Sequence, residues 1–311
     1  MTATVRSLWH AVRIPDQPEP FDTAVLKVHY PALVTGSDEE RLSGNFRADP
    51  ANAPYPVVLI LSGINVGQDA YRWLAADLAA RGFAAVTYDW VGPLFAGQVG
   101  LTPGVDLALA RPDTYGQGPT CQAIAPIIGA LSGLLDGALD TTRLALVGHS
   151  AGGTVALQSG RFFRGVRAVA TYGAHTMVST MLGWPAGTIA PALVESPVLL
   201  LAGTEDGVIA GSSDRYGAAG SHDPVSRTFD EALPDRGGEH VLAWLRGGNH
   251  FSIADPVDPT SARAFLDRPS TVDPEKGRAA IAGVLTAFLS THLRGEVAEE
   301  YESPLLTIRR R

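Results

Sequence analysis

The sequence contains a single cysteine, Cys121, which excludes an internal disulfide framework and a cysteine-based zinc cluster. Charged residues are also few, at 18% of the 311 positions, and the net charge of -8 offers no basic surface for nucleic acid or for an anionic membrane. No apolar run reaches the roughly 18 residues that a membrane-spanning helix needs. The first 20 residues lack the continuous apolar stretch of a signal peptide. We therefore expect a cytoplasmic protein that binds neither nucleic acid nor membranes.

Apolar sequence is abundant, at 45% hydrophobic residues, and this fraction is too high for a disordered protein. Because no linker, internal repeat or change in composition divides the chain, we predict one domain over residues 1–311. Within it, we expect residues 1–20 to be an N-terminal extension and residues 295–311 to be a tail, either solvated or an edge strand. The sequence does not distinguish a monomer from a homodimer.

Short apolar runs alternate with helical patterns, which predicts an α/β fold with a mostly parallel sheet and helices on both faces. An earlier segment, residues 21–30, alternates apolar and polar side chains and is expected to be an antiparallel edge strand. The expected strands of the parallel sheet are residues 56–62, 83–89, 143–147, 166–172, 197–203 and 240–246. The expected helices are residues 68–81, a stretch within 120–139, a segment starting at 150, residues 224–233 and residues 274–293.

The strongest chemical motif is Gly148-His149-Ser150-Ala151-Gly152, which fills the pattern G-x-S-x-G. It follows an apolar strand and precedes a helix-forming run, which is the context that the pattern requires in a nucleophile elbow. The two glycines suit a sharp turn in which a side chain would collide with neighbouring backbone. Such a turn holds a serine hydroxyl above the carboxyl edge of the sheet, at a helix N-terminus that favours negative charge. Ser150 is therefore the candidate nucleophile.

A serine nucleophile needs a base, because its hydroxyl reacts poorly at its own pKa. Among the eight histidines, His250 lies in the loop after the last expected parallel strand and before the last helix. That position places it at the same sheet edge as Ser150. His175 also follows a strand and is the rival base, although we favour it as a residue that lines the pocket. His149, inside the elbow, is expected to point away from the position of a base.

A carboxylate should hold the imidazole in the correct tautomer and stabilise the imidazolium. The strand-ending segment GTED, residues 203–206, offers two adjacent candidates. We favour Asp206, whose shorter side chain suits a tight loop, over Glu205. The chain order is then Ser150, Asp206, His250, which is the order expected for α/β-hydrolases and differs from those of the chymotrypsin and subtilisin types.

An oxyanion hole needs two backbone N–H groups directed at the developing negative oxygen. One should belong to Ala151, the residue after the nucleophile. The other should come from the loop that follows the expected strand 56–62, where Gly63 allows the backbone to turn closely. In that loop we favour the N–H of Ile64 over that of Asn65.

With these residues assembled, the sequence resembles the α/β-hydrolase superfamily over nearly its whole length. It is most similar to the branch that holds dienelactone-hydrolase-like proteins, cutinase- and chlorophyllase-like esterases and platelet-activating-factor acetylhydrolases. The matching segments are PVVLILSGINVG (56–67), GHSAGG (148–153), GTEDGV (203–208) and GGNHFSIAD (247–255). The resemblance implies hydrolysis of carboxylic esters through an acyl-enzyme, without a cofactor or metal.

Two positions depart from the pattern of these relatives. Dienelactone hydrolase itself uses a cysteine nucleophile where this chain has Ser150, so its lactone substrate is not carried over. Many relatives have His-Gly before the oxyanion donor, where this chain has Ser62-Gly63.

About two dozen residues, 175–196, separate two expected strands, which is too short for a large helical cap. We therefore predict a relatively open site for small to medium esters of apolar or amphipathic character. Residues 209–221 and 254–274 are the candidates to fold over its rim. The candidate pocket residues, besides Ile64, are Asn65, Trp90, His175, Met177, Val208, Ile209 and Phe251.

The expected function is a serine carboxylesterase that acts on a small-molecule ester. The same triad would also serve a thioesterase, an acyltransferase or an amidase, because one acyl-enzyme chemistry underlies all of them. A binding protein with a relic triad is disfavoured, since Ser150, Asp206 and His250 are all present. The histidines show no H-E-x-x-H or comparable spacing, so no catalytic metal is expected.

Overall fold

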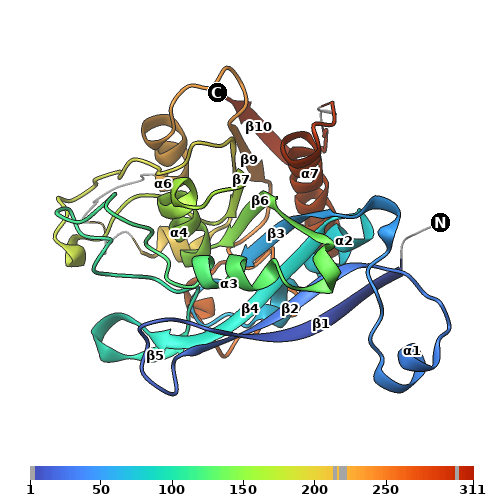
Figure 1. Ribbon diagram of the computed structural model, residues 1–311. Helices are drawn as coiled ribbons and strands as arrows, with labels where there is room; N and C mark the ends of the chain where they lie inside the picture. Colours follow the sequence, from blue (N-terminus) through green and yellow to red (C-terminus); the bar gives the residue numbers. More distant parts are fainter. Residues whose placement is uncertain (1–3, 213–215, 217–222, 298–300) are drawn as a thin grey trace.

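The computed structural model describes residues 4–212, 216, 223–297 and 301–311 (Figure 1). These residues form a ten-stranded sheet that carries helices on both faces. The strands are β1 (Thr4–Arg13), β2 (Thr23–Ala32), β3 (Tyr55–Leu61), β4 (Ala84–Pro93), β5 (Val99–Leu101), β6 (Leu139–His149), β7 (Val166–Tyr172), β8 (Val198–Gly203), β9 (Val241–Leu245) and β10 (Leu306–Arg310). The helices are α1 (Asp38–Ser43), α2 (Arg72–Ala80), α3 (Ile124–Leu131), α4 (Ala151–Ser159), α5 (Gly207–Ala210), α6 (Pro224–Arg227) and α7 (Pro274–Arg294).

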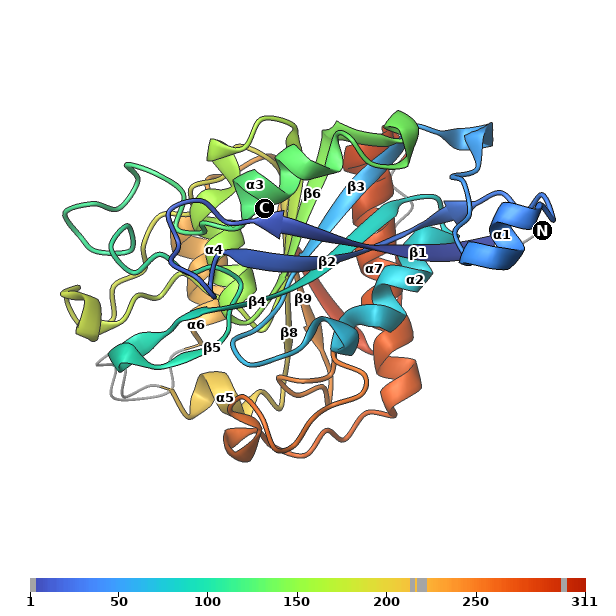
Figure 2. The same cartoon turned by 60° about the horizontal axis from the view of Figure 1, so that its bottom comes forward.

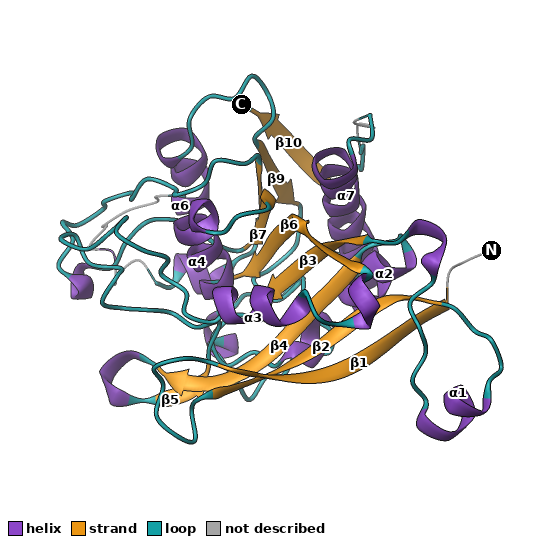
Figure 3. Cartoon of the chain, viewed as in Figure 1, coloured by secondary structure: helices purple, strands orange, loops and turns teal. Residues whose placement is uncertain are grey.

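The centre of the sheet is parallel, as the apolar runs predict. Strands β4, β3, β6, β7, β8 and β9 lie side by side in that order and run in the same direction (Figure 3). Every residue of β3 is buried, because helices cover both faces of the sheet there. The predicted strand 166–172 begins and ends at the residues of β7.

Both ends of the sheet are antiparallel. Strand β2 was expected at the edge, but it lies between β1 and β4, and β1 forms the edge. Residues 4–13, predicted as part of an N-terminal extension, are therefore a strand of the sheet. Most residues of β1 are exposed or half-buried, so its sequence lacks the clear apolar face that predicts a strand. At the other edge, β10 pairs with β9, which selects the edge strand over a solvated tail.

The core has two halves, one on each face of the sheet. Successive residues of β3 alternate between them: Val57 and Leu59 belong to one half, Val58 and Ile60 to the other. Helices α3, α4 and α6 supply the first half, and α2 and α7 the second. Figure 2 shows α4 and α6 on one side of the sheet and α2 and α7 on the opposite side.

The expected helices are present with altered ends. The segment predicted as one helix over 68–81 starts with a 3-10 turn at Gln68–Tyr71 before α2 begins. The segment 224–233 consists of α6 followed by a π-helical turn at Thr228–Ala232. The last helix has the expected cap, since the Asp273 side chain accepts from the N–H of Lys276 at 3.0 Å.

The connection between β7 and β8 contains a 3-10 turn at Thr180–Leu182 and no larger helical cap. Strands β3, β6, β7, β8 and β9 all end at the same edge of the sheet, because they are parallel neighbours. In the part of the chain that the structure describes, no helix is long and apolar enough to cross a membrane.

Candidate active site

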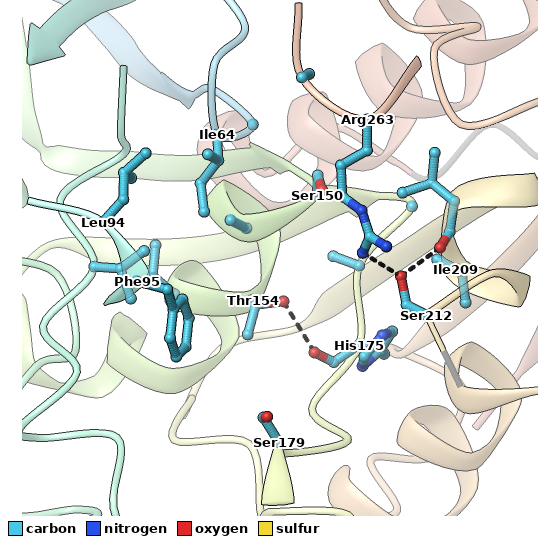
Figure 4. Close-up of a pocket in the computed structure, with 18 of the residues that line it drawn as sticks. Ile64, Leu94, Phe95, Ser150, Thr154, His175, Ser179, Ile209, Ser212 and Arg263 are labelled. Carbon is cyan, nitrogen blue, oxygen red and sulfur yellow. Dashed lines mark hydrogen bonds between the residues drawn. The ribbon is translucent and has the colours of Figure 1, made fainter. Parts of the chain in front are cut away.

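Ser150 lies at the junction between β6 and α4, with φ 53° and ψ -123°. A positive φ is unfavourable for a residue with a side chain, so the surrounding structure must hold it in place. The N–H of Ser150 donates to the carbonyl of Tyr172 on the neighbouring strand at 3.0 Å, and its own carbonyl accepts from the N–H of Thr154 at 3.0 Å. These bonds fix the turn that brings Ser150 to the lining of a cavity (Figure 4).

The glycines of the motif are required by close backbone contacts. A Cβ on Gly148 would lie 2.3 Å from the N of Gly153, and one on Gly152 would lie 2.3 Å from the carbonyl oxygen of Leu61 and 2.5 Å from that of Ser62. No rotation of a side chain can relieve these contacts, because the neighbouring atoms are backbone. The start of α4 therefore packs directly against the end of β3.

His250 and Asp206 form a buried pair. The Nδ1 atom of His250 lies 2.7 Å from Oδ2 of Asp206, and the other carboxylate oxygen accepts from the N–H of Ile209 at 2.8 Å. A carboxylate can only accept, so Nδ1 donates and Nε2 is left for proton exchange. Glu205, the alternative acid, meets the hydroxyl of Thr204 at 3.5 Å and is not the partner of His250.

The end of β7 makes room for this pair. A Cβ on Gly173, which has φ +60°, would lie 2.9 Å from Nδ1 of His250 and 3.2 Å from Oδ2 of Asp206. Two residues later, the carbonyl of His175 accepts from the hydroxyl of Thr154 at 3.0 Å (Figure 4). Burial lowers the pKa of His175 to about 4, and its Nδ1 atom has no partner among the described residues. Of the two histidines weighed as base, only His250 has a carboxylate partner among those residues.

Asp267, which the sequence patterns did not single out, ties the acid loop to the base loop. One of its oxygens accepts from the N–H of Gly207 at 2.9 Å and from the N–H of His250 at 3.3 Å, and the other accepts from the N–H of Phe251 at 3.3 Å. Burial raises the pKa of Asp267. Its position in a polar, irregular run carries no motif, so only the folded chain reveals this role.

His149 points into the protein beneath the site, as expected. Its Nδ1 atom lies 2.7 Å from the hydroxyl of Tyr71, and its Nε2 atom lies 3.0 Å from the carbonyl oxygen of His250. The same Tyr71 hydroxyl accepts from the N–H of Gly63 at 3.1 Å. Burial and the neighbouring His250 lower the pKa of His149 well below its usual value, so this imidazole is neutral.

The two backbone N–H groups expected to face a developing oxyanion have no acceptor in the part of the chain that the structure describes. The N–H of Ile64 donates to no acceptor among the described residues, whereas the N–H of Asn65 donates to the carbonyl of Leu101 at 2.9 Å. Ala151 is the first residue of α4, so its N–H has no partner within the helix. The hydrogen bonds thus favour Ile64 over Asn65 as the donor.

The cavity beside Ser150 has a volume of about 570 Å³, which lies in the usual range for small-molecule sites. Most of the pocket residues predicted from the sequence lie at its wall, and they come from different loops at the carboxyl edge of the sheet. These are Ile64, Asn65, His175, Met177, Val208, Ile209 and Phe251.

The prediction that Trp90 lines the pocket is wrong. Its side chain is 2% exposed and belongs to the core, and its indole N–H donates to the carbonyl of Phe21 at 2.8 Å. The residue lies near the end of β4, where alternate side chains point to opposite faces of the strand. Position after a strand alone could not tell which face Trp90 takes.

The two sides of the cavity differ in character (Figure 4). One side is largely apolar and includes Leu94 and Phe95, from a connection that the sequence analysis did not assign to the site. The opposite side includes Ser212 and Arg263, whose Nη1 atom donates to the Ser212 hydroxyl at 2.7 Å. The polar segment 254–274 thus does reach the rim, as expected. Of the other rim segment, 209–221, residues 213–215 and 217–221 lie outside the described residues.

The described residues contain no group of three or more histidine, cysteine, aspartate or glutamate side chains that could hold a metal ion.

Comparison with known proteins identifies the fold rather than a family. No family model matches the sequence, and no curated protein matches it. Among solved structures, a ferulic acid esterase from Streptomyces cinnamoneus is similar, with a TM-score of 0.67 over 99% of this chain and 97% of that chain, at 17% sequence identity. This chain has the α/β-hydrolase fold, as predicted. Since 789 chains of solved structures match and the fold hosts many activities, the fold alone does not identify the substrate.

Proposed function

We propose that this protein is a serine hydrolase that cleaves carboxylic esters through an acyl-enzyme intermediate. Ser150 is the nucleophile, His250 the general base and acid, and Asp206 the carboxylate that orients His250. The backbone N–H groups of Ile64 and Ala151 form the oxyanion hole. The similarity to a ferulic acid esterase supports ester hydrolysis as the reaction.

The observation that carries the proposal is the buried bond of 2.7 Å between Nδ1 of His250 and Oδ2 of Asp206, beside the elbow that holds Ser150 at positive φ. A core histidine could be satisfied by a backbone carbonyl, but an acidic partner is what an imidazole needs when it must become positively charged during turnover. His250 and Ser150 line the same cavity, so both can reach one substrate.

In the proposed reaction, Nε2 of His250 removes the proton from the hydroxyl of Ser150 as Oγ attacks the ester carbonyl carbon. The carbonyl oxygen becomes an oxyanion that accepts from the N–H groups of Ile64 and Ala151. The carbon–oxygen bond to the alcohol then breaks, and the imidazolium gives its proton to the leaving oxygen. Water, deprotonated by His250, attacks the acyl-enzyme and releases the acid in the same way.

The proposed substrate is a small to medium ester with an apolar part. The cavity volume of about 570 Å³ would enclose such a molecule, and the side formed by Leu94 and Phe95 suits its apolar part. The side with Ser212 and Arg263 is polar and suits a more polar group at the other end. An amphipathic ester matches both sides.

Replacement of the nucleophile tests the reaction. In Ser150→Ala, we expect turnover of p-nitrophenyl acyl esters to fall by about 10⁴-fold or more, and covalent labelling by a fluorophosphonate to be lost. Ser132→Ala is a matched control, because Ser132 is exposed and its hydroxyl donates to the carbonyl of Gly129 at 2.8 Å, so the variant should label and turn over like the parent. Retention of turnover and labelling in Ser150→Ala would overturn the proposal.

The bond that is cleaved is decided by matched substrates. Rates on an ester, a thioester and an amide with one common acyl group should be highest for the ester. A higher rate on the thioester or amide would reassign the enzyme to that class. A panel that varies acyl and alcohol length independently, with a feruloyl ester included, would define the substrate. Failure of a fluorophosphonate to modify the protein under any condition would favour a binding protein.

The base predicts a pH profile. Because His250 must be neutral to accept the proton of Ser150, kcat/KM should fall on the acid side. A flat profile from about pH 5 to pH 8 would show that no histidine acts as base.

A further inference from the structure

A chain of buried hydrogen bonds runs beneath the site from one catalytic loop to another. It starts at the N–H of Gly63, which donates to the hydroxyl of Tyr71 at 3.1 Å. That hydroxyl lies 2.7 Å from Nδ1 of His149, and Nε2 of His149 lies 3.0 Å from the carbonyl oxygen of His250. Tyr71 and His149 are each about 1% exposed, so solvent has little access to these bonds.

The direction of each bond follows from its ends. The carbonyl of His250 can only accept, so Nε2 of His149 must carry a proton and donate. A neutral imidazole then has Nδ1 as its acceptor, which receives the hydroxyl proton of Tyr71. The oxygen of that hydroxyl accepts from the N–H of Gly63. All donors and acceptors are paired in one arrangement, so the chain holds a single tautomer of His149.

The side chains of Tyr71 and His149, which form this chain of hydrogen bonds, stay neutral. Burial and the adjacent His250 lower the pKa of His149 well below its usual value, and burial raises the pKa of Tyr71. The rings of His149 and His250 have centroids 4.9 Å apart, so a charged His149 would repel the imidazolium form of His250. A neutral His149 holds its neighbour without opposing that charge.

We propose that Tyr71 and His149 are positioning residues that couple the oxyanion loop, residues 62–65, to the loop that carries His250. Gly63 directly precedes Ile64, so its bond to Tyr71 sets the position of the N–H group assigned to the oxyanion hole. This inference rests on the proposed function. Tyr71 would then anchor the oxyanion loop of this protein, which has Ser62-Gly63 where many relatives have His-Gly.

The packing around Gly63 makes this coupling tight. A Cβ at that residue would lie 3.2 Å from Nδ1 of His149 and 3.3 Å from Cβ of Ser150. The loop backbone is therefore in close contact with both the nucleophile and the imidazole. A shift of His149 would be passed on to the oxyanion loop, because the gap between them is narrower than an added methyl group requires.

The loop of His250 has additional anchors, which limits the expected effect. The hydroxyl of Tyr172 donates to the carbonyl of Asn249 at 2.8 Å, and Asp267 accepts from the N–H of His250. Loss of the coupling should therefore misalign the reacting groups without detaching the loop. A misalignment of this kind lowers the rate of the chemical step more than it weakens substrate binding.

The test compares kcat per titrated active serine in Tyr71→Phe, His149→Leu, His149→Gln and the double variant Tyr71→Phe/His149→Leu. The amide of glutamine can accept from Tyr71 and donate to His250 in the same order as the imidazole, so it serves as the conservative variant. Tyr55→Phe is the matched control. Tyr55 is another buried tyrosine with a bonded hydroxyl, which donates to the backbone carbonyl of Asp49, and it lies at the end of β3 opposite to Gly63.

We expect Tyr71→Phe and His149→Leu each to lower kcat about 10-fold while KM changes less than about twofold. The double variant should be no slower than the slower single variant, because either change breaks the same chain. His149→Gln should keep kcat within about threefold of the parent, and Tyr55→Phe should keep it unchanged. Since neither member of the chain ionises, the midpoint of the acid limb of kcat/KM should move by less than about half a pH unit in each active variant.

Three results would overturn the coupling. The first is a loss of kcat in the double variant equal to the product of the two single losses, and the second is a kcat in His149→Gln no higher than in His149→Leu. The third is a midpoint of the acid limb of kcat/KM that shifts when residue 149 is replaced. If His149→Leu does not fold, Tyr71→Phe and His149→Gln still decide, because an unchanged kcat in Tyr71→Phe contradicts the proposal. Ser150→Ala separates this inference from the proposed function. An inactive Ser150→Ala with a fully active Tyr71→Phe removes only the coupling, whereas an active Ser150→Ala removes the proposed function itself.

Discussion

The floor of the cavity and its outer walls are built in different ways. The floor consists of Ser150, His149 and His250, which are held by close backbone contacts and buried hydrogen bonds at the ends of parallel strands. The walls include Phe95 and Met181, which are 36% and 70% exposed and come from irregular connections. The floor residues are closely packed and have almost no freedom to change position, whereas the exposed wall residues have space around them.

This contrast separates chemistry from selectivity. A residue in the floor acts through its exact position, so its replacement should change the rate of the chemical step or the stability of the fold. A residue in the wall contributes apolar surface, so its replacement should change the affinity for one substrate relative to another.

The largest effect is expected for Asp206, the proposed acid that bonds the floor residue His250. Asp206→Asn should lower kcat by about 10⁴-fold, because an amide no longer holds the tautomer of His250 or stabilises its charged form. Glu205→Gln, one residue earlier, should stay within about twofold of the parent, since Glu205 does not contact His250. Steady-state kinetics on one p-nitrophenyl ester measures both. A larger loss in Glu205→Gln than in Asp206→Asn would reverse the assignment.

The next effect concerns the backbone of the two regions. Gly152→Ala places a Cβ 2.3 Å from the carbonyl oxygen of Leu61, so the fold should lose about 3 kcal/mol or more of its free energy of unfolding. Gly97 lies in the wall connection at φ +72° with no atom within 4 Å of an added Cβ. Gly97→Ala should therefore cost only about 1 kcal/mol, the strain of its conformation. Urea denaturation would show the difference, and equal losses would contradict it.

A third comparison uses pH. Burial lowers the pKa of His175 beside the cavity, and of His29 far from it, to about 4 from the usual value of 6.5. The unfolded chain therefore binds more protons between these values, so the free energy of unfolding falls as the pH drops from about 6.5 towards 4. Each histidine should contribute a loss on the order of 3 kcal/mol, which is absent above about pH 6.5 and complete below about pH 4.

Substitution separates the two histidines. His175→Gln and His29→Gln should each reduce the slope of stability against pH in this window, because one buried titrating group is removed. Only His175→Gln should also alter kinetics, since its side chain lines the cavity. Denaturation at a series of pH values, combined with KM measurements, provides the comparison. An unchanged slope in both variants would show that other groups dominate acid sensitivity.

The smallest effect is expected at the wall. Phe95→Ser should raise KM for an ester with a long apolar part by roughly 3- to 10-fold, with kcat and stability nearly unchanged, because apolar contact is lost without disturbing the floor. Phe265→Ser is the control, since Phe265 is 81% exposed and does not line the cavity. A fall in kcat in Phe95→Ser would show that wall and floor are not independent.

Sequence patterns predicted the floor better than the walls, for a physical reason. The elbow at Ser150 is a local structure whose glycines are demanded by contacts within a few residues and with the adjacent strand. The order of apolar runs placed Asp206 and His250 at the same edge, and their bond of 2.7 Å is present in the structure. Asp267 and Tyr71, which anchor these loops, carry no motif and were not recognised as part of the site.

The walls depended on long-range packing. Trp90 directly follows the expected strand 83–89, where a pocket residue is expected, yet in the structure it is part of β4 and faces the core. Phe95, in the connection after β4, reaches the cavity. Likewise, β1 becomes the edge of the sheet because it pairs with β2, although few of its own residues are buried. Neither outcome follows from the spacing of residues in the segment itself.

The sequence by itself determined the α/β fold, the elbow and the order of Ser150, Asp206 and His250 at the carboxyl edge of the sheet, because strand periodicity and tight turns are set by neighbouring residues. Only the tertiary structure decided which N–H of the loop after β3 is left without an acceptor among the described residues, which carboxylate meets His250 and which loops form the walls. Those outcomes depend on where separate segments cross one another. The chain from Gly63 through Tyr71 and His149 to His250 joins residues nearly two hundred positions apart, and folding alone brings them within hydrogen-bonding distance.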